Sequence, residues 1–150
     1  MANSFAKIII HFIFSTKKRQ PLITKEISSE LWAYMGGIAR KHKMIPLAIG
    51  CMADHAHVCV IIPPKMSTSK AVQFIKGGSS LWIHDKFPEC KHFKWQEGYG
   101  AFGIGESMIS KIRAYILNQE KHHSNISFQE EYRRLLDLYK IEYNEKFLWG

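Results

Sequence analysis

The sequence predicts an α+β fold: a ferredoxin-like antiparallel sheet with helices on one face, plus a C-terminal helix that carries a tyrosine. Three observations support this prediction. Short β-branched segments alternate with longer segments of helical periodicity. Their order along the chain is β-α-β-β-α-β, with further helices after it. The 150 residues contain no repeat or linker that would divide them, so we expect a single domain of residues 1–150.

The first half of the chain supplies three strands and one helix. Ala6–Ser15 is rich in β-branched and aromatic residues and predicts the first strand. Lys25–Lys43 has helical periodicity, and Thr24 can cap its start. The segments Leu47–Met52 and His55–Ile62 predict the second and third strands, which a short turn connects.

The second half begins with another helix and two short strands. The helix starts at Ser67 or Ser69 and continues through Ile83. Phe93–Gln96 and Tyr99–Ile104 predict short strands or turns that glycines punctuate.

Two helices are expected to follow the last strand. Ser107 can cap a third helix that extends from Met108 to about Lys121, and a fourth covers roughly Ser127–Tyr139. A sheet with helices on one face leaves its other face less covered, so that face is where we expect a site or a partner.

Charge and cysteine content restrict the class of protein. Lysine and arginine number 21 against 13 acidic residues, which gives a net charge of +8 and a field that concentrates polyanions. Charge alone does not choose between DNA, RNA and anionic lipid. Three cysteines without a CxxC pair argue against a disulfide framework or a zinc ribbon and favour a reducing, cytoplasmic location. No apolar run approaches the ~20 residues that cross a bilayer, so we expect no membrane partner.

Two histidines on the third predicted strand are the clearest chemical signal. His55 and His57 lie two residues apart, so their imidazoles should project from the same face of the strand, a common way to hold a divalent metal. Asp54 can orient one imidazole from behind. Ala56 and Val58 should face the core. Spacing alone leaves open a plainer interpretation, in which the two histidines merely occupy a half-exposed strand.

A tyrosine and a glutamine on the third predicted helix are the second signal. Tyr115 and Gln119 are four residues apart and share one helix face. Gln119 offers an amide oxygen to a metal, and Tyr115 is a usable nucleophile where a cation favours its phenolate. His122 is an alternative ligand, although a helix cap or phosphate contact suits it better. The plainer interpretation places Tyr115 in the core, in a stripe with Ile112.

Taken together, these motifs resemble the HUH-type single-tyrosine transposases of the smallest bacterial insertion sequences and their REP-associated relatives. The family pattern is Asp-His-hydrophobic-His on a strand, then Tyr-x-x-x-Gln on a distant helix, and it matches Asp54–His57 and Tyr115–Gln119. The flanking segments HFIFSTKKRQPLI, KMSTSKAVQFIKGGSS and WQEGYGAFGIGES resemble the family as well. Ala56 is smaller than the usual Val or Ile between the histidines.

The resemblance implies a mechanism and partners. His55, His57 and Gln119 would hold Mg²⁺ or Mn²⁺, and the ion would polarise a scissile phosphate. Tyr115 would attack that phosphate, leaving a 5′-phosphotyrosine and a free 3′-hydroxyl. The substrate would be single-stranded DNA with hairpins, bound by a homodimer. In many family members the tyrosine helix completes the partner's active site.

Basic and aromatic residues are the candidate DNA contacts. Interleaved aromatic residues are able to stack bases, but most of them are expected in the core, so none is singled out as a base-stacking residue; they are Trp32, Trp82, Phe93, Trp95 and Tyr99. The candidate phosphate contacts are basic side chains spread over several predicted elements: Lys17, Lys18, Arg19, Arg40, Lys41, Lys43, Lys76, Lys111, Arg113 and His122.

Two other functions compete with transposition. A non-catalytic single-stranded nucleic-acid-binding domain also has a ferredoxin-like sheet with basic loops, but an RNP1-type pattern is absent and the histidine pair would be unexplained. A metal-dependent phosphodiesterase that uses water would form no covalent adduct. The HxHxDH hydrolases match poorly because no Asp-His pair follows His57.

Overall fold

Antiparallel strands form the centre of the molecule. The computed structural model describes residues 4–119 and 126–150. Within them, a four-stranded sheet has the order β2-β3-β1-β4, and each neighbouring pair is antiparallel. The strands are β1 (Ile8–Ser15), β2 (Ile45–Cys51), β3 (His55–Ile62) and β4 (Gly100–Ile104). This order confirms the predicted ferredoxin-like sheet.

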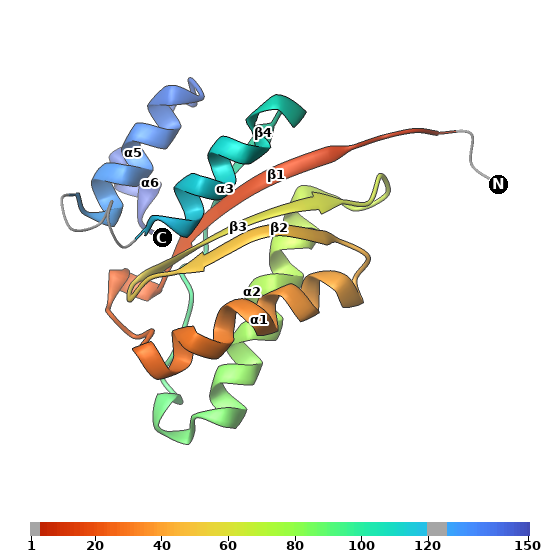
Figure 1. The fold of residues 1–150 in the computed structure, drawn as a ribbon. Coiled ribbons are helices and arrows are strands. Elements are labelled where there is room, and N and C mark those ends of the chain that lie inside the picture. The colour runs from red at the N-terminus through yellow and green to blue at the C-terminus, as the bar shows by residue number, and fades with distance from the viewer. Residues whose placement is uncertain (1–3, 120–125) are drawn as a thin grey trace.

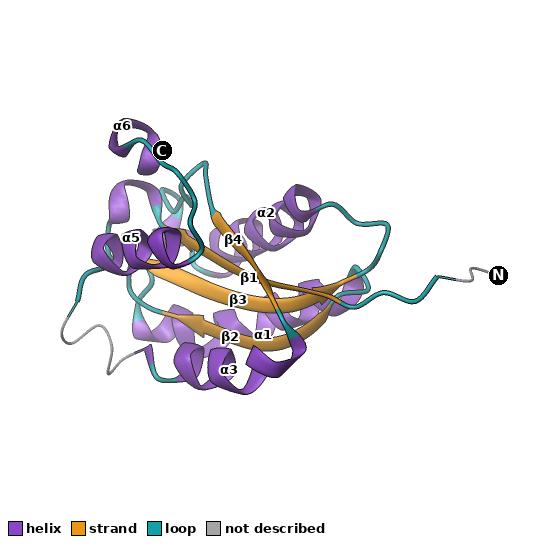
Figure 2. Ribbon diagram, turned by 90° about the horizontal axis from the view of Figure 1, so that it is seen from above, coloured by secondary structure: helices purple, strands orange, loops and turns teal. Residues whose placement is uncertain are grey.

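Helices cover both faces of the sheet (Figures 1 and 2). On one face lie α1 (Lys25–Lys41) and α2 (Thr68–Lys86). On the other face lie α3 (Ile109–Leu117) and α5 (Phe128–Leu138). Helices were expected on one face of the sheet, with a C-terminal helix in addition; the later helices α3 and α5 bury their apolar sides against the remaining face. The short α6 (Glu145–Leu148) lies beyond α5.

Side-chain alternation separates two hydrophobic cores. Phe12 and Phe14 of β1 pack with α1 and α2, and so do Ala56 and Val58 of β3, as predicted. The intervening residues, such as Ile13, pack with α3 and α5 on the other face. His55 and His57 alternate with Ala56 and Val58 along β3, so they point toward α3 and α5.

Side-chain caps define where most of the long helices begin. Thr24 accepts a hydrogen bond from the Ile27 amide at the start of α1, as predicted, and Ser67 rather than Ser69 caps α2. The expectation for Ser107 was wrong. Ser107 lies inside a 3₁₀ turn, η3 (Glu106–Met108), whose Met108 amide bonds to the Gly105 carbonyl, so α3 begins at Ile109 without a side-chain cap.

The remaining boundaries differ by small amounts. Phe93–Gln96 contributes only a single bridge, between Trp95 and Thr16. It is made by the Lys17 amide, which donates to the Lys94 carbonyl, and by the Gln96 amide, which donates to the Ser15 carbonyl. α3 ends at Leu117, where the Asn118 amide bonds to the Ala114 carbonyl. Two further 3₁₀ turns, η1 (Lys17–Arg19) and η2 (Pro88–Cys90), follow β1 and α2.

Gly50 on β2 determines how closely α3 approaches the sheet. A Cβ atom at Gly50 would lie 2.8 Å from the backbone oxygen of Ile116 and 3.0 Å from a methyl carbon of the same residue. A backbone atom has little room to yield, so only glycine allows this contact. Since Tyr115 precedes Ile116, the same contact fixes the depth of the tyrosine.

We therefore predict that Gly50→Ala destabilises the protein by about 1–3 kcal/mol, since α3 has to move away from β2. Gly103→Ala is the matched control, because a Cβ atom at Gly103 meets nothing within 4 Å. Urea unfolding of the three proteins measures both effects. Equal stability of Gly50→Ala and Gly103→Ala would show that the close approach is not a constraint.

Candidate active site

Two buried imidazoles form the base of the site. β3 presents His55 and His57 on the face that α3 and α5 cover, and both side chains are fully buried. Each ring has a partner at Nδ1: Asp54 Oδ1 lies 2.7 Å from His55 Nδ1, and His11 Nε2 lies 2.8 Å from His57 Nδ1. Both Nε2 atoms therefore turn inward, which is the arrangement found where outer partners orient metal-binding histidines.

His11 is a member of the site that sequence reasoning missed. It lies on β1, opposite Cys59 of β3, and is fully buried beside His57. Burial and the neighbouring His57 ring lower the pKa of His11 to about 3, against a smaller opposing effect of Glu131, so His11 is neutral at physiological pH. The available signal was a lone histidine inside the apolar strand IIIHFIFS.

The structure brings Tyr115 and Gln119 to these histidines. The Tyr115 ring lies 5.7 Å from the ring of His57, centroid to centroid. Gln119 is buried, and its Oε1 lies 3.5 Å from His55 Nε2. Its amide nitrogen donates to the Tyr115 carbonyl at 3.1 Å, so the two residues hold each other across one helical turn.

Glu131 is the second residue that sequence reasoning missed. Its carboxylate is 2% exposed, with Oε1 3.1 Å from His57 Nε2 and 3.4 Å from His55 Nε2. The hydroxyl of Tyr115 donates to its other oxygen. A signal existed in the sequence, because Glu131 shares a helix face with Phe128 and Leu135, both of which are buried.

The electrostatic environment differs between the groups. Burial lowers the pKa of His55, but hydrogen bonds to Asp54 and Glu131 outweigh it, so the net shift is upward. Burial, together with the hydrogen bond to the Glu131 carboxylate and its negative charge, raises the pKa of Tyr115 well above its ordinary value. The phenol is therefore neutral beside an anion, and a cation in the site would offset the charge that holds its proton.

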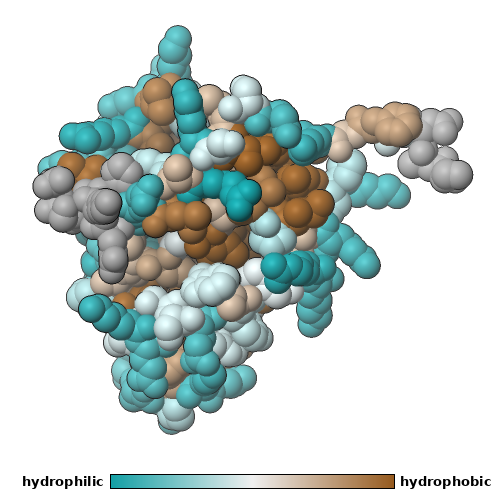
Figure 3. Space-filling view, viewed as in Figure 1, coloured by the Kyte–Doolittle hydropathy of each residue, from teal (hydrophilic) through white to brown (hydrophobic). Residues whose placement is uncertain are grey.

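A cleft of about 550 Å³ reaches Gln119 at the edge of this site. It is lined by residues of α1, β2 and the end of α3, including Lys25, Trp32, Leu117 and Gln119. Trp32 is 54% exposed there. Figure 3 shows hydrophobic side chains gathered in the band between α3 and α1, where the edge strand β2 lies.

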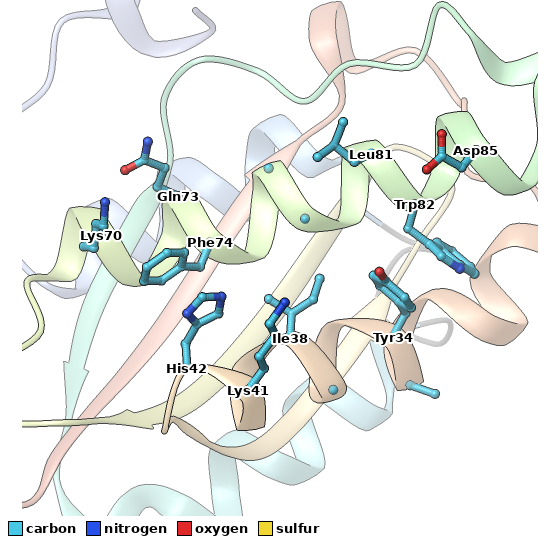
Figure 4. A pocket seen from close by; sticks show the side chains of 14 residues that line it. Tyr34, Ile38, Lys41, His42, Lys70, Gln73, Phe74, Leu81, Trp82 and Asp85 are labelled. Atoms are coloured by element: carbon cyan, nitrogen blue, oxygen red, sulfur yellow. The ribbon is translucent and has the colours of Figure 1, made fainter.

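A larger cleft, of about 850 Å³, lies away from the histidines. It separates α1 from α2 on the opposite face of the sheet. Figure 4 shows His42 facing Phe74 and Tyr34 beside Trp82 across it, and these pairs are stacked at 3.6 Å and 4.8 Å between ring centroids. The size of this cleft does not make it the reactive site, since none of the buried histidines lines it.

The basic turn η1 lies at the histidine end of the sheet. It follows Ser15, which pairs with His55, and the Thr16 amide bonds to the Asp54 carbonyl. Lys18 and Arg19 both adopt positive φ angles, 57° and 56°. The Arg19 guanidinium lies 5.1 Å from the centre of the Trp149 ring.

The other candidate phosphate contacts occupy different surroundings. The cations at the end of α1 and on the outer side of α3 are exposed: Arg40, Lys41, Lys43, Lys111 and Arg113. His122 lies outside the described residues. Lys76 is different, because its ammonium donates to three consecutive carbonyls, those of Gln96, Glu97 and Gly98, at 2.6, 3.2 and 3.0 Å. Burial lowers the pKa of Lys76 to about 8, although the negative charge of Glu97 acts in the opposite direction.

The arrangement at Lys76 predicts a structural role. Lys76→Met removes three charge-assisted hydrogen bonds to the segment before β4 and should lower the free energy of unfolding by about 1–3 kcal/mol. Lys70→Met on the exposed side of α2 is the control and should change it by less than about 0.5 kcal/mol. Urea denaturation compares them. Unchanged stability of Lys76→Met would return Lys76 to the set of cations available for DNA.

Comparison with known proteins agrees with this architecture. The family profile described as "Transposase IS200 like" matches residues 4–119. The transposase for insertion sequence element IS200 of Salmonella typhimurium is 31% identical over 115 residues, which cover 73% of this chain and 74% of that protein. The corresponding Salmonella typhi transposase aligns with the same values.

Two solved structures share the fold. One, from Deinococcus radiodurans R1 and ascribed to a transposase, has a TM-score of 0.64 at 23% identity and covers 79% of this chain and 95% of that one. The other is a REP-associated tyrosine transposase bound to a REP hairpin, with a TM-score of 0.60 at 17% identity, covering 84% and 74%. At these identities the likeness establishes the fold alone.

Proposed function

The chain belongs to the family of IS200-like transposases, and on that premise we propose that it cleaves and rejoins single-stranded DNA through a covalent bond to Tyr115. The observation that carries this proposal is that side chains from separate elements meet in space. Two imidazole nitrogens, an amide oxygen and a tyrosine hydroxyl meet at one buried point, although they come from β3, α3 and the residues after α3.

The residues present fit a divalent ion. His55, His57 and Glu131 have ligand atoms within 4.8 Å of one another, and Gln119 Oε1 lies 3.5 Å from His55 Nε2. The Nδ1 partners of both rings leave Nε2 for coordination. We propose that His55, His57 and Gln119 hold Mg²⁺ or Mn²⁺. When bound, the ion would supply positive charge at the scissile phosphate.

The covalent step exchanges one phosphate ester for another. The Tyr115 oxygen attacks phosphorus and forms a phosphotyrosine with the 5′ end of the downstream fragment, while the bond from phosphorus to the 3′ oxygen of the upstream fragment breaks. The phenol loses a proton and the departing 3′ oxygen gains one, so no nucleotide or redox cofactor is consumed. Attack by a 3′-hydroxyl on the phosphotyrosine reverses the exchange and rejoins a strand.

The smaller cleft suits an unpaired strand next to the reacting phosphate. It reaches Gln119 at one end, and the exposed face of Trp32 is available to a base. Lys25 lines the same cleft and can approach a phosphate. We propose that the nucleotides beside the cleavage point lie here, with the basic turn η1 contacting the backbone at the histidine end of the sheet. Both features favour a single strand over a duplex, whose bases are already stacked.

We propose that one chain supplies all the side chains of one site. Tyr115, Gln119 and both histidines of one chain already meet. We nevertheless propose that the protein acts as a homodimer on two hairpin-bearing DNA ends, as its family membership implies, with each copy contributing a site. We also propose a cytoplasmic location, where a DNA substrate would be found. Among the described residues, no helix is long and apolar enough to cross a membrane.

Tyr115→Phe tests the covalent mechanism. The substitution keeps the ring and its packing but removes the attacking oxygen, so cleavage and the covalent protein–DNA species on denaturing gels should both be lost, by at least a thousandfold in rate. DNA affinity should stay within threefold of the wild type. Tyr99→Phe is the control and should retain both activities. A wild-type protein that cleaves DNA without ever forming an adduct would favour the water-using phosphodiesterase.

Trp32→Ala tests the strand path. Loss of base stacking should weaken binding of a hairpin with a single-stranded flank by about 1–3 kcal/mol, measured by fluorescence anisotropy, whereas Trp32→Phe should recover most of that affinity. Leu81→Ala is the control, because Leu81 is an exposed apolar residue beside the larger cleft on the other face. An equal loss for Leu81→Ala would move the single strand to the opposite face.

A further inference from the structure

Glu131 comes from a part of the chain that the family profile does not cover. The profile ends at residue 119, whereas α5 begins at Phe128 and brings Glu131 back to the histidines. We propose that Glu131 is an anionic ligand of the divalent ion and that its second oxygen holds the Tyr115 hydroxyl beside that ion. This inference rests on the proposed function for the identity of the ion, but its test does not depend on DNA cleavage.

The separations around Glu131 match those of atoms that share an ion. Oxygen and nitrogen ligands about 2.0–2.1 Å from a metal lie about 3.0–3.4 Å from one another in octahedral or tetrahedral geometry. Oε1 of Glu131 is 3.1 Å from His57 Nε2 and 3.4 Å from His55 Nε2, and His55 Nε2 is 3.5 Å from Gln119 Oε1. The two Glu131 distances fall within this range, and the Gln119 distance is slightly longer.

Charge gives Glu131 a role that the other groups cannot fill. Two imidazoles and an amide form a neutral site, whereas Mg²⁺ and Mn²⁺ prefer hard, anionic oxygen ligands. A carboxylate that is 2% exposed is costly to bury unless positive charge or several donors compensate it. A bound cation would add positive charge beside Glu131, and Glu131 would add an anionic oxygen to the cation's ligands.

The two oxygens of Glu131 divide their contacts between the ion and the nucleophile. Oε1 faces the imidazole nitrogens, and Oε2 accepts from the Tyr115 hydroxyl. One planar carboxylate thus fixes the distance between the ion position and the attacking oxygen. We assign Glu131 a positioning role toward Tyr115 in addition to its role as a ligand.

The C-terminal segment keeps Glu131 in place. Phe128, one helical turn before Glu131, packs against the His55 ring at 4.9 Å between centroids. Ser127 caps α5 through the Glu130 amide. Farther along, Arg133 pairs with Glu145 and lies 5.2 Å from the centre of the Trp149 ring. Contacts before and after Glu131 therefore limit how far its helix can shift.

Titration of the free protein with Mn²⁺, followed by electron paramagnetic resonance, tests the ligand assignment. Glu131→Gln keeps the shape of the side chain and an acceptor for Tyr115 but loses the charge, so it should fold and bind Mn²⁺ at least tenfold more weakly. His57→Ala should show a similar or greater loss. Glu130→Gln is the matched control, because Glu130 is the exposed neighbour on the same helix, and it should stay within twofold of the wild type.

The positioning role has its own readout. At Mn²⁺ concentrations that saturate both proteins, Glu131→Gln should form the Tyr115–DNA adduct at least fivefold more slowly with unchanged DNA affinity. Circular dichroism checks folding, and if Glu131→Gln is unfolded, Glu131→Asp takes its place with an expected loss in Mn²⁺ affinity of at least threefold. Equal adduct rates at saturating Mn²⁺ overturn the positioning role.

The outcomes separate this inference from the proposed function. If Glu131→Gln binds Mn²⁺ as the wild type does, or if wild-type binding does not depend on His57, the ligand assignment is wrong even where the adduct forms. If Mn²⁺ binding depends on Glu131 but no adduct forms with any single strand, the proposed function is wrong and the ligand assignment stands.

Discussion

Side chains alternate along β3, and both halves of the molecule depend on that alternation. Every second residue enters the core against α1 and α2, and the residues between them enter the layer beneath α3 and α5. A shift of one residue in the pairing of β3 with β1 would exchange His57 with its apolar neighbours and put imidazoles into the larger core. The large apolar cluster on the first face therefore secures the register, and the register places the polar groups on the second.

Those polar groups form a buried network rather than a set of independent side chains. His11, His57, Glu131 and Tyr115 are linked through consecutive hydrogen bonds beneath α3 and α5. Removing one member of such a network leaves another without compensation, which typically costs about 3–5 kcal/mol for a buried charge pair. If His57 binds an ion through Nε2, its Nδ1 carries the proton and donates to His11 Nε2, so the neutral state of His11 is what this tautomer requires.

The sequence indicated the antiparallel sheet, the order of the elements along the chain and one half of the site. His55 and His57 could be predicted from the sequence because the period-two spacing of a strand places them on one face. Tyr115 and Gln119 could be predicted because four-residue spacing places them on one face of a helix. Glu131 and His11 could not be predicted in this way. Each contacts His57, from which they lie 74 and 46 residues away in the sequence, and only tertiary packing brings them together. The sequence does show a charged or polar residue within an apolar stripe at both Glu131 and His11. That signal does not identify the residue that each of them contacts.

Two further features were not predicted from the sequence, the coverage of both sheet faces by helices and the start of α3, because neither has a distinct local sequence signal. A 3₁₀ turn supplies the hydrogen bonds that a serine cap at residue 107 would have supplied, and the two are alike at the level of local sequence. The docking of α5 involves aromatic packing against the C-terminal segment on the same face of the sheet, in which Phe128 and Tyr132 contact Trp149. These contacts have long sequence separation and no local signature.

The positive φ angles of Lys18 and Arg19 indicate that the backbone of the turn η1 is held in one conformation. This conformation costs free energy in residues other than glycine, and it persists only where neighbouring contacts impose it. Here the Thr16 hydroxyl donates to the Gln20 carbonyl across the turn, and Trp149 lies against Arg19. The backbone beneath these cations is already ordered before a phosphate arrives, so binding there forfeits less conformational entropy than binding by lysines on a flexible loop. If such a preformed cationic turn contacts DNA as proposed, it would favour backbones whose phosphate spacing matches that of its cations over backbones that would have to bend to meet it.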